Sequence, residues 1–139
     1  MTTITQPAPL NFLGATARIL ATGSLGLVHM DKPAGEMPPL HVHQNEDEGF
    51  YVLDGELTLY LPGDSVTLRA GGFFLAPRGI PHSYEVGAGG ARVLVSSVPS
   101  GFERFVADVA ALEQVDPAAL TDVAARHGIE ILGPPGARP

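Results

Sequence analysis

Apolar residues between Arg18 and Ser97 come in short runs that glycine- and proline-rich turns interrupt. Alternating apolar and polar positions within these runs indicate β-strands, because successive side chains of a strand point to opposite faces. The dipeptide Asp54-Gly55 lies between two apolar runs and predicts a two-residue hairpin. The whole pattern predicts an all-β sandwich or barrel. The predicted strands lie near 17–21, 25–32, 40–43, 48–54, 56–61, 65–69, 73–76, 82–86 and 91–97.

After Val98 the apolar positions recur with the spacing of a helix. Asp116 and Pro117 predict the N-cap and first residue of a second helix, and Gly128 predicts its end. The Gly-Pro-Pro-Gly segment at 133–136 is expected to lie outside regular structure. The apolar face of the first helix comprises Phe102, Phe105, Val106, Val109 and Leu112. We expect three parts: an N-terminal arm (1–16), a β-barrel (17–98) and a C-terminal helical extension (99–139).

Composition narrows the classes of function. The 139 residues suffice for one domain with a hydrophobic core. The net charge of −7 and the scattered basic residues argue against nucleic-acid binding, and the absence of cysteine excludes thiolate metal sites. The N-terminus lacks the features of a signal peptide, and no stretch approaches the roughly 20 apolar residues of a membrane span. We expect a cytoplasmic protein whose partner is a small molecule, with neither nucleic acid nor membrane bound.

Three histidines and one glutamate are candidate metal ligands: His41, His43, Glu48 and His82. His41 and His43 share a face of one predicted strand, Glu48 follows after a hairpin or bulge, and His82 belongs to a separate strand. Imidazole and carboxylate ligands without sulfur suit one divalent transition metal, namely Fe, Mn, Ni, Co, Cu or Zn. Such a set leaves coordination positions open to substrate or dioxygen.

Glu48 is also the candidate catalytic group, because a carboxylate beside a metal can act as a general base on a bound hydroxyl. It could be a ligand, a base or both. Glu46 and Asp47 adjoin it, and a bulge would change which carboxylate faces inward. We expect Glu48 to face the metal and the other two to form a solvated acidic turn.

Two glycine-framed segments contain these residues. The first has Gly35, five residues, His41-x-His43, four residues, Glu48, six residues and Gly55. The second has Gly71, five residues, Pro77-x-Gly79, two residues and His82. Over roughly residues 35–86 these segments resemble the two motifs of the cupin superfamily, and Val86 stands where the second motif has asparagine.

The resemblance implies a small double-stranded β-helix, or jelly-roll barrel, with two additional C-terminal helices and a metal inside. The family's ligands correspond to His41, His43, Glu48 and His82 in this chain. The closing GIEILGPP segment also resembles small bacterial cupins described as quercetin-dioxygenase-like. Because many cupins pair through edge strands or N-terminal arms, we expect a homodimer.

Several side chains are candidates for the substrate pocket. Counting by twos from Glu48 and from His82 places apolar and aromatic residues on the metal face of their strands. His29 could line the cavity or be a packed or rim residue. The candidate pocket residues are Met37, Phe50, Val52, Tyr84, Val86 and His29.

These features favour a metal-dependent, dioxygenase-like enzyme acting on a small, largely apolar phenolic or enolic substrate. A metal acting only as a Lewis acid would instead support isomerase, cyclase or lyase chemistry. A non-catalytic barrel that binds a small molecule is the third hypothesis.

Overall fold

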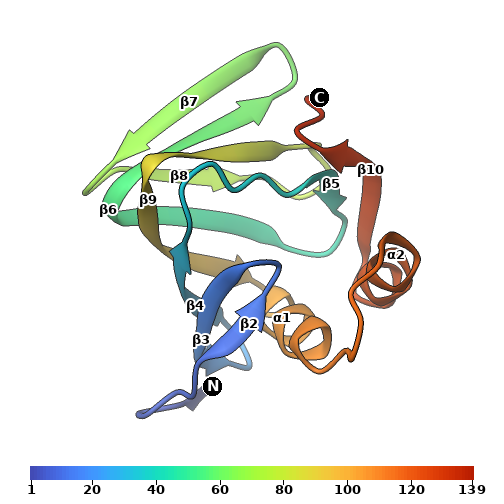
Figure 1. Cartoon of the computed structure of the whole chain (residues 1–139). Helices are drawn as coiled ribbons and strands as arrows, with labels where there is room; N and C mark the ends of the chain where they lie inside the picture. Colours follow the sequence, from blue (N-terminus) through green and yellow to red (C-terminus); the bar gives the residue numbers. More distant parts are fainter.

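Ten strands and two helices form the computed structural model, which describes residues 1–139 (Figure 1). The strands are β1 (Thr2–Thr3), β2 (Leu10–Phe12), β3 (Ala15–Thr22), β4 (Gly26–Lys32), β5 (Pro39–His43), β6 (Asp47–Leu61), β7 (Asp64–Arg69), β8 (Phe73–Ala76), β9 (Ser83–Val98) and β10 (Ile129–Pro135). The helices are α1 (Phe102–Ala110) and α2 (Pro117–Arg126). Neither helix is long and apolar enough to cross a membrane.

The strands wind into the predicted jelly-roll barrel. Eight of them form one sheet in the order β1-β3-β4-β9-β6-β7, with β2 added to β3 and β8 added to β6. The other two, β5 and β10, form a separate antiparallel pair. An isolated antiparallel bridge between His41 and His82 joins this pair to the segment that leads into β9. The core fills the inside of the barrel with buried aliphatic and aromatic side chains.

The predicted hairpin at Asp54-Gly55 is wrong. These residues lie inside the continuous strand β6, paired with Arg92 and Ala91 of β9, and the register shifts on both sides of them. Gly55 has a φ of 80°, which suits a bulge as well as a turn, and the local pattern does not distinguish the two. The strands predicted near 82–86 and 91–97 are likewise parts of one continuous strand, β9. Both long strands, β6 and β9, can therefore bend and continue around the barrel.

The N-terminal arm folds back on its own chain. β1 pairs with the end of β3 through Thr2 and Thr22, and β2 pairs with its beginning through Leu10 and Ala17. The arm thus extends the sheet at its edge (Figure 1). The expected homodimer stays a prediction.

The C-terminal extension follows the predicted helices and then departs from the prediction. The predicted apolar face of α1 is largely buried, and the Asp116 side chain accepts a hydrogen bond of 2.8 Å from the Ala119 N–H at the start of α2. The tail, however, is not irregular, because 129–135 form the strand β10 against β5. Its prolines are compatible with a strand because β10 has a neighbour on one side only.

Gly55→Ala tests the role of the bulge. A Cβ at this position would collide with the Gly90 carbonyl oxygen, in addition to the strain of a positive φ. We expect the free energy of unfolding to fall by about 3 kcal/mol or more, measured by urea denaturation. Gly63→Ala is the control, because Gly63 has a φ of 72° and no atom within 4 Å of the added carbon. It should cost about 1 kcal/mol, and equal losses in the two variants would contradict the packing argument.

Candidate metal centre

Strand β5 places the first two histidines. His41 and His43 alternate with Val42 and pair with Ile131 and Ile129 of β10 on one side. On the other side, the His41 N–H donates to the His82 carbonyl at 3.2 Å, and the His82 N–H donates back to the His41 carbonyl at 2.9 Å. Backbone pairing therefore brings these histidines together although about forty residues separate them in the sequence.

A turn just before His82 places this residue opposite His41. Gly79 has a φ of 79°, and its N–H donates to the His43 carbonyl at 2.8 Å. The Ile80 N–H closes the turn onto the Pro77 carbonyl at 3.4 Å. The glycine and proline of the second motif thus set the direction from which the chain reaches His82.

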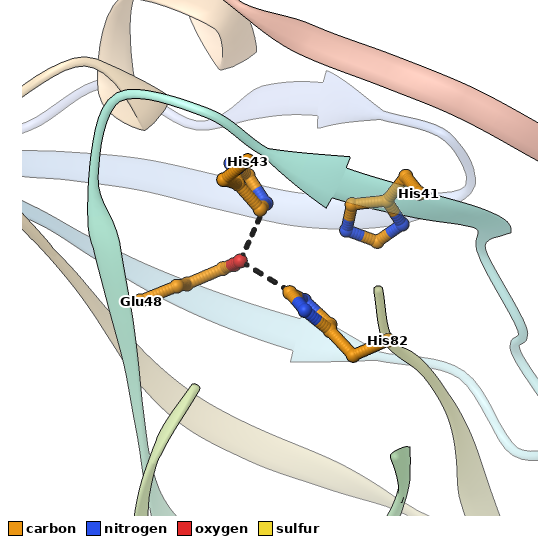
Figure 2. A group of neighbouring side chains, drawn as sticks. All are labelled: His41, His43, Glu48 and His82. Carbon is orange, nitrogen blue, oxygen red and sulfur yellow. Dashed lines mark ion pairs between the residues drawn. The ribbon is translucent and has the colours of Figure 1, made fainter. Parts of the chain in front are cut away.

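Glu48 completes the group from β6. It lies between Ala76 of β8 and Ser97 of β9, and its side chain points toward the three imidazoles (Figure 2). Glu48 Oε2 lies 2.6 Å from His43 Nε2 and 3.3 Å from His82 Nε2. One ligand atom from each of the four residues lies within 4.8 Å of all the others. The four predicted ligands are therefore neighbours in the fold.

The donor atoms of this group fit a metal ion. His43 Nε2, Glu48 Oε2 and His82 Nε2 are buried, and apart from their contacts with one another they have no hydrogen-bond partner. Buried polar atoms without partners are costly and rare in folded proteins. A shared cation would satisfy all of them, because nitrogen and oxygen ligands lie about 2.0–2.2 Å from such an ion. His41, His43, Glu48 and His82 could thus hold a divalent metal.

Hydrogen bonds at the far side of the rings fix which nitrogen is available. His41 Nδ1 lies 2.7 Å from the Pro39 carbonyl oxygen, which can only accept, so Nδ1 carries the proton. His43 Nδ1 lies 2.9 Å from Glu46 Oε1. Both contacts involve Nδ1 and therefore leave Nε2 to coordinate a metal. Metal-binding histidines usually have such a partner at the other ring nitrogen, which fixes the orientation of the ring.

The prediction that Glu46 lies in a solvated acidic turn is therefore wrong. Its side chain is 2 % exposed and touches His43. Only its neighbour Asp47 fits the expectation, since it forms a partly exposed ion pair with Arg78 at 3.1 Å. The sequence offered one signal: Glu46 lies three residues after His43 and can fold back onto it across the turn. A charge run alone does not reveal that one of its members is buried.

Burial and mutual charge shift the pKa values within the metal-free group. Burial, and then the neighbouring His82 and His43, lower the pKa of His41 to about 3. Burial also acts to lower the pKa of His43, but the carboxylates of Glu48 and Glu46 outweigh it and raise this pKa to about 10. Burial acts to raise the pKa of Glu48, yet contact with His43 and His82 holds it well below its usual value. His43 and Glu48 thus form an ion pair in the absence of metal.

A narrow apolar cavity of about 40 Å³ adjoins the candidate ligands. His41, His43 and Glu48 face it, while His82 lies behind them and is 1 % exposed. Of the predicted pocket residues, Phe50 and Tyr84 line the cavity.

The other four predicted pocket residues lie elsewhere. Val52 and Val86 share a strand face with the ligands but are packed in the core, one pleat beyond the cavity. Met37 lies in the loop before β5 and is 41 % exposed. His29 faces away, because the cavity-lining residues of β4 are Met30 and Lys32, on the opposite face.

Other walls of the cavity are formed by residues that lie outside the two sequence motifs. The arm, the two helices and β10 all contribute apolar side chains, and Phe12 packs edge-to-face on Phe102 and Phe105. The helical period predicted that Phe102 and Phe105 would be buried, but it could not show against what. The lining residues that sequence reasoning missed in this part of the cavity are Phe12, Leu13, Phe102, Phe105, Leu120, Ile129 and Ile131.

A second polar group lines the cavity, and of its members only Tyr84 was predicted. The Lys32 ammonium donates to Tyr84 Oη at 2.5 Å and to Glu36 Oε2 at 3.2 Å. Burial lowers the pKa of Lys32, although Glu36 opposes the change. Burial, and then the carboxylates of Glu36 and Glu48, raise the pKa of Tyr84 well above its usual value. A lone lysine at the end of a predicted strand gave no sequence signal of burial.

Comparison with known proteins agrees with this geometry. A family model described as a cupin domain matches residues 28–97. Quercetin 2,3-dioxygenase of Bacillus subtilis is 42 % identical over 67 residues, which make up 48 % of this chain and only 20 % of that protein. The structure of KdgF from Halomonas is similar, with a TM-score of 0.59 and 25 % identity over 63 % of this chain and 80 % of that one. An RmlC-like cupin from Shewanella frigidimarina has a TM-score of 0.63 and 20 % identity over 72 % and 90 % of the respective chains.

Glu46→Gln tests the support behind His43. The amide still accepts a hydrogen bond but loses the charge that increases the basicity of the ring. We expect the affinity for Zn²⁺ to fall by about tenfold or more, measured by competition with a chromophoric chelator. Asp47→Asn is the matched control, because it removes the adjacent charge at a site that pairs only with Arg78. Equal losses in both variants would show that general electrostatics, rather than the contact to His43, matters.

The metal-free protein should be most stable near pH 6.5. Below that pH, the lowered pKa values of His41 and Glu48 mean that the unfolded chain binds more protons, so stability falls as the pH falls. Above it, the raised pKa of His43 means that the folded chain keeps a proton, so the stability that His43 contributes falls as the pH rises toward 10. The lowered pKa of Lys32 acts in the opposite direction in the alkaline range. Melting temperatures of chelator-treated protein between pH 4 and 10 check this. His43→Gln should flatten the alkaline side, and an unchanged profile would contradict the assignment.

Proposed function

The chain belongs to the cupin family, and from that premise we propose that it is a metal-dependent oxygenase of the dioxygenase type, acting on a small phenolic or enolic substrate. The observation that carries the proposal is a buried set of three imidazoles and one carboxylate that opens onto an apolar cavity. The partial identity with a quercetin 2,3-dioxygenase supports the oxidative assignment. The aligned segment spans one fifth of that protein, so its activity as a whole is part of the proposal.

His41, His43, Glu48 and His82 would hold the metal, whose identity among Fe, Mn, Ni, Co, Cu and Zn the donor set leaves open. A redox-active metal would supply Lewis acidity toward a substrate hydroxyl and a path for electrons to dioxygen. The chain's own residues supply the surroundings. Three imidazoles with free Nε2 atoms need no rearrangement to coordinate, because the bonds to Pro39 and Glu46 already orient two of them.

Glu48 is the proton acceptor in this proposal. Its pKa is held well below the usual range, so it is ionised at neutral pH. Glu48 lines the cavity, and its carboxylate has a second oxygen besides the Oε2 atom that contacts the imidazoles. A substrate hydroxyl that enters beside His41 and His43 would therefore meet a carboxylate able to take its proton. Phe50 and the aromatic residues of α1 keep water away from this step.

The cavity limits the size of the substrate. A volume of about 40 Å³ holds little more than a few small groups, whereas pockets for drug-sized ligands typically measure about 300–1,000 Å³. A flavonoid would require the walls to move. We therefore propose a substrate smaller than quercetin, with apolar carbon atoms against Phe50 and the helices.

A non-oxidative metal enzyme is the second candidate, and one observation favours it. Lys32 and Tyr84 place two proton-bearing groups in the same cavity as Glu48. Proton transfer between such groups and an enolisable substrate would support isomerase, cyclase or lyase chemistry without dioxygen. The two candidates differ in whether turnover needs oxygen.

Metal analysis and oxygen uptake on untagged protein test the proposal. We expect near-stoichiometric metal that is lost in His41→Ala/His43→Ala, and oxygen consumption with small phenols or enols. Glu48→Gln should lower turnover by roughly 10²–10⁴-fold. His29→Ala is the matched control, since His29 faces away from the cavity. Equal product formation without oxygen would favour the second candidate, and the absence of metal after reconstitution would contradict both.

A further inference from the structure

Lys32 is the only lysine of the chain, and it is buried. It is the last residue of β4, its side chain is 1 % exposed, and it lines the cavity beside the candidate metal centre. The other seven residues of the lysine and arginine total are arginines. An ammonium group in an apolar cavity is costly unless it is paired, so its partners show what the site can do.

Backbone hydrogen bonds assemble those partners. The Gly35 N–H donates to the Val86 carbonyl, and the Val86 N–H donates to the Glu36 carbonyl, both at 3.0 Å. The loop after β4 is thereby held along β9, which brings Glu36 and Tyr84 to Lys32. The Lys32 ammonium also lies 4.6 Å from the centre of the Tyr84 ring. Tyr84 follows His82 by two residues, so this group lies about 7 Å along the strand from a candidate ligand.

The balance of donors and acceptors points to a missing acceptor. An ammonium group has three N–H donors, and the structure pairs two of them, with Tyr84 and Glu36. Tyr84 Oη accepts from Lys32 and still carries its own proton. One lysine N–H therefore has no partner and can donate to a further group, and it lies beside the phenol O–H of Tyr84, which Glu36 also approaches. Among the residues lining the cavity, Lys32 and Tyr84 are the only polar side chains besides His41, His43 and Glu48.

We propose that Lys32 and Tyr84 bind the carboxylate of a small substrate whose other oxygen function faces the candidate metal centre. The unpaired lysine N–H would donate to one oxygen of the carboxylate, and the Tyr84 hydroxyl would turn from Glu36 to donate to the other. Hydrogen bonds between charged partners are the strongest that the site can form. The apolar residues between the two polar ends, such as Phe50 and Met30, would contact the carbon atoms that link them. The proposed function supplies the reaction on this substrate, whereas the carboxylate site itself rests on Lys32 and Tyr84.

A purely structural Lys32–Glu36 pair is the competing explanation, and the single lysine allows a direct test. Full-length protein labelled with ¹⁵N and ¹³C in lysine has one lysine side-chain signal in NMR spectra. The probes are 3-hydroxybutanoate and its uncharged isostere 3-hydroxybutanamide, titrated into metal-free and zinc-loaded protein. We expect the acid to shift the Lys32 signal and to bind at least about tenfold more tightly than the amide. A Lys32 signal that does not move at saturating acid would overturn the proposal.

Variants provide a second, independent readout. Lys32→Met/Glu36→Gln removes both charges of the pair, and exchanging a buried ion pair for uncharged groups is often neutral for stability. It should bind the acid and the amide equally. The matched control is Arg92→Met/Asp31→Asn, which removes a surface ion pair of 3.1 Å with the same change in charge and should keep the preference for the acid. Tyr84→Phe should weaken binding of the acid without abolishing the preference.

The two proposals fail in different ways. Zinc content measured on the same samples reports on the candidate metal centre, and its absence would contradict the metal-dependent function. The shift of the Lys32 signal in metal-free protein reports on the carboxylate site alone. A preference for the acid that persists in Lys32→Met/Glu36→Gln would overturn the carboxylate site even if zinc binds normally.

Discussion

The pairing of β6 with β9 is the constraint on which the rest of the structure depends. These two long strands fix Glu48 against Ser97 at one end and place Tyr84 against Leu59 at the other. The bulge at Gly55 lets the paired strands bend together, so that each continues around the barrel. Glu48 and Tyr84 lie on this ladder, and Lys32 lies on β4, which pairs with β9. His41 bonds to His82 in the segment that leads into β9.

The sequence predicts the parts of the site whose positions follow from strand periodicity and from motif spacing. His41, His43, Glu48 and His82 could be named, and the fold brings them together. Glu46 could not be assigned, because whether a carboxylate is buried depends on a partner that a turn brings to it. The bulge at Gly55 was mistaken for a hairpin because both structures require the same positive φ, and only the pairing across the sheet separates them.

Residues outside the family match also shape the cavity. The matched segment ends at residue 97, yet Phe102, Phe105 and Leu120 of the helices line the cavity. Phe12 from the arm packs against the same helix. The candidate ligands therefore lie within the segment that the family model matches, whereas much of the wall that would select a substrate lies outside that segment. This explains why chemistry can be inferred from the family more readily than the substrate.

The position of the single lysine has a consequence for the chemistry of the whole surface. All cations that face solvent on side chains are guanidinium groups, several of them paired with carboxylates such as Asp31, Asp47 and Glu56. Acylating reagents and reactive thioesters, which attack primary amines, would find no lysine on the surface of the described structure. Because Lys32 is buried, such a reagent could modify it only when the cavity opens. The rate of modification of Lys32 would therefore measure how often the cavity opens to solvent.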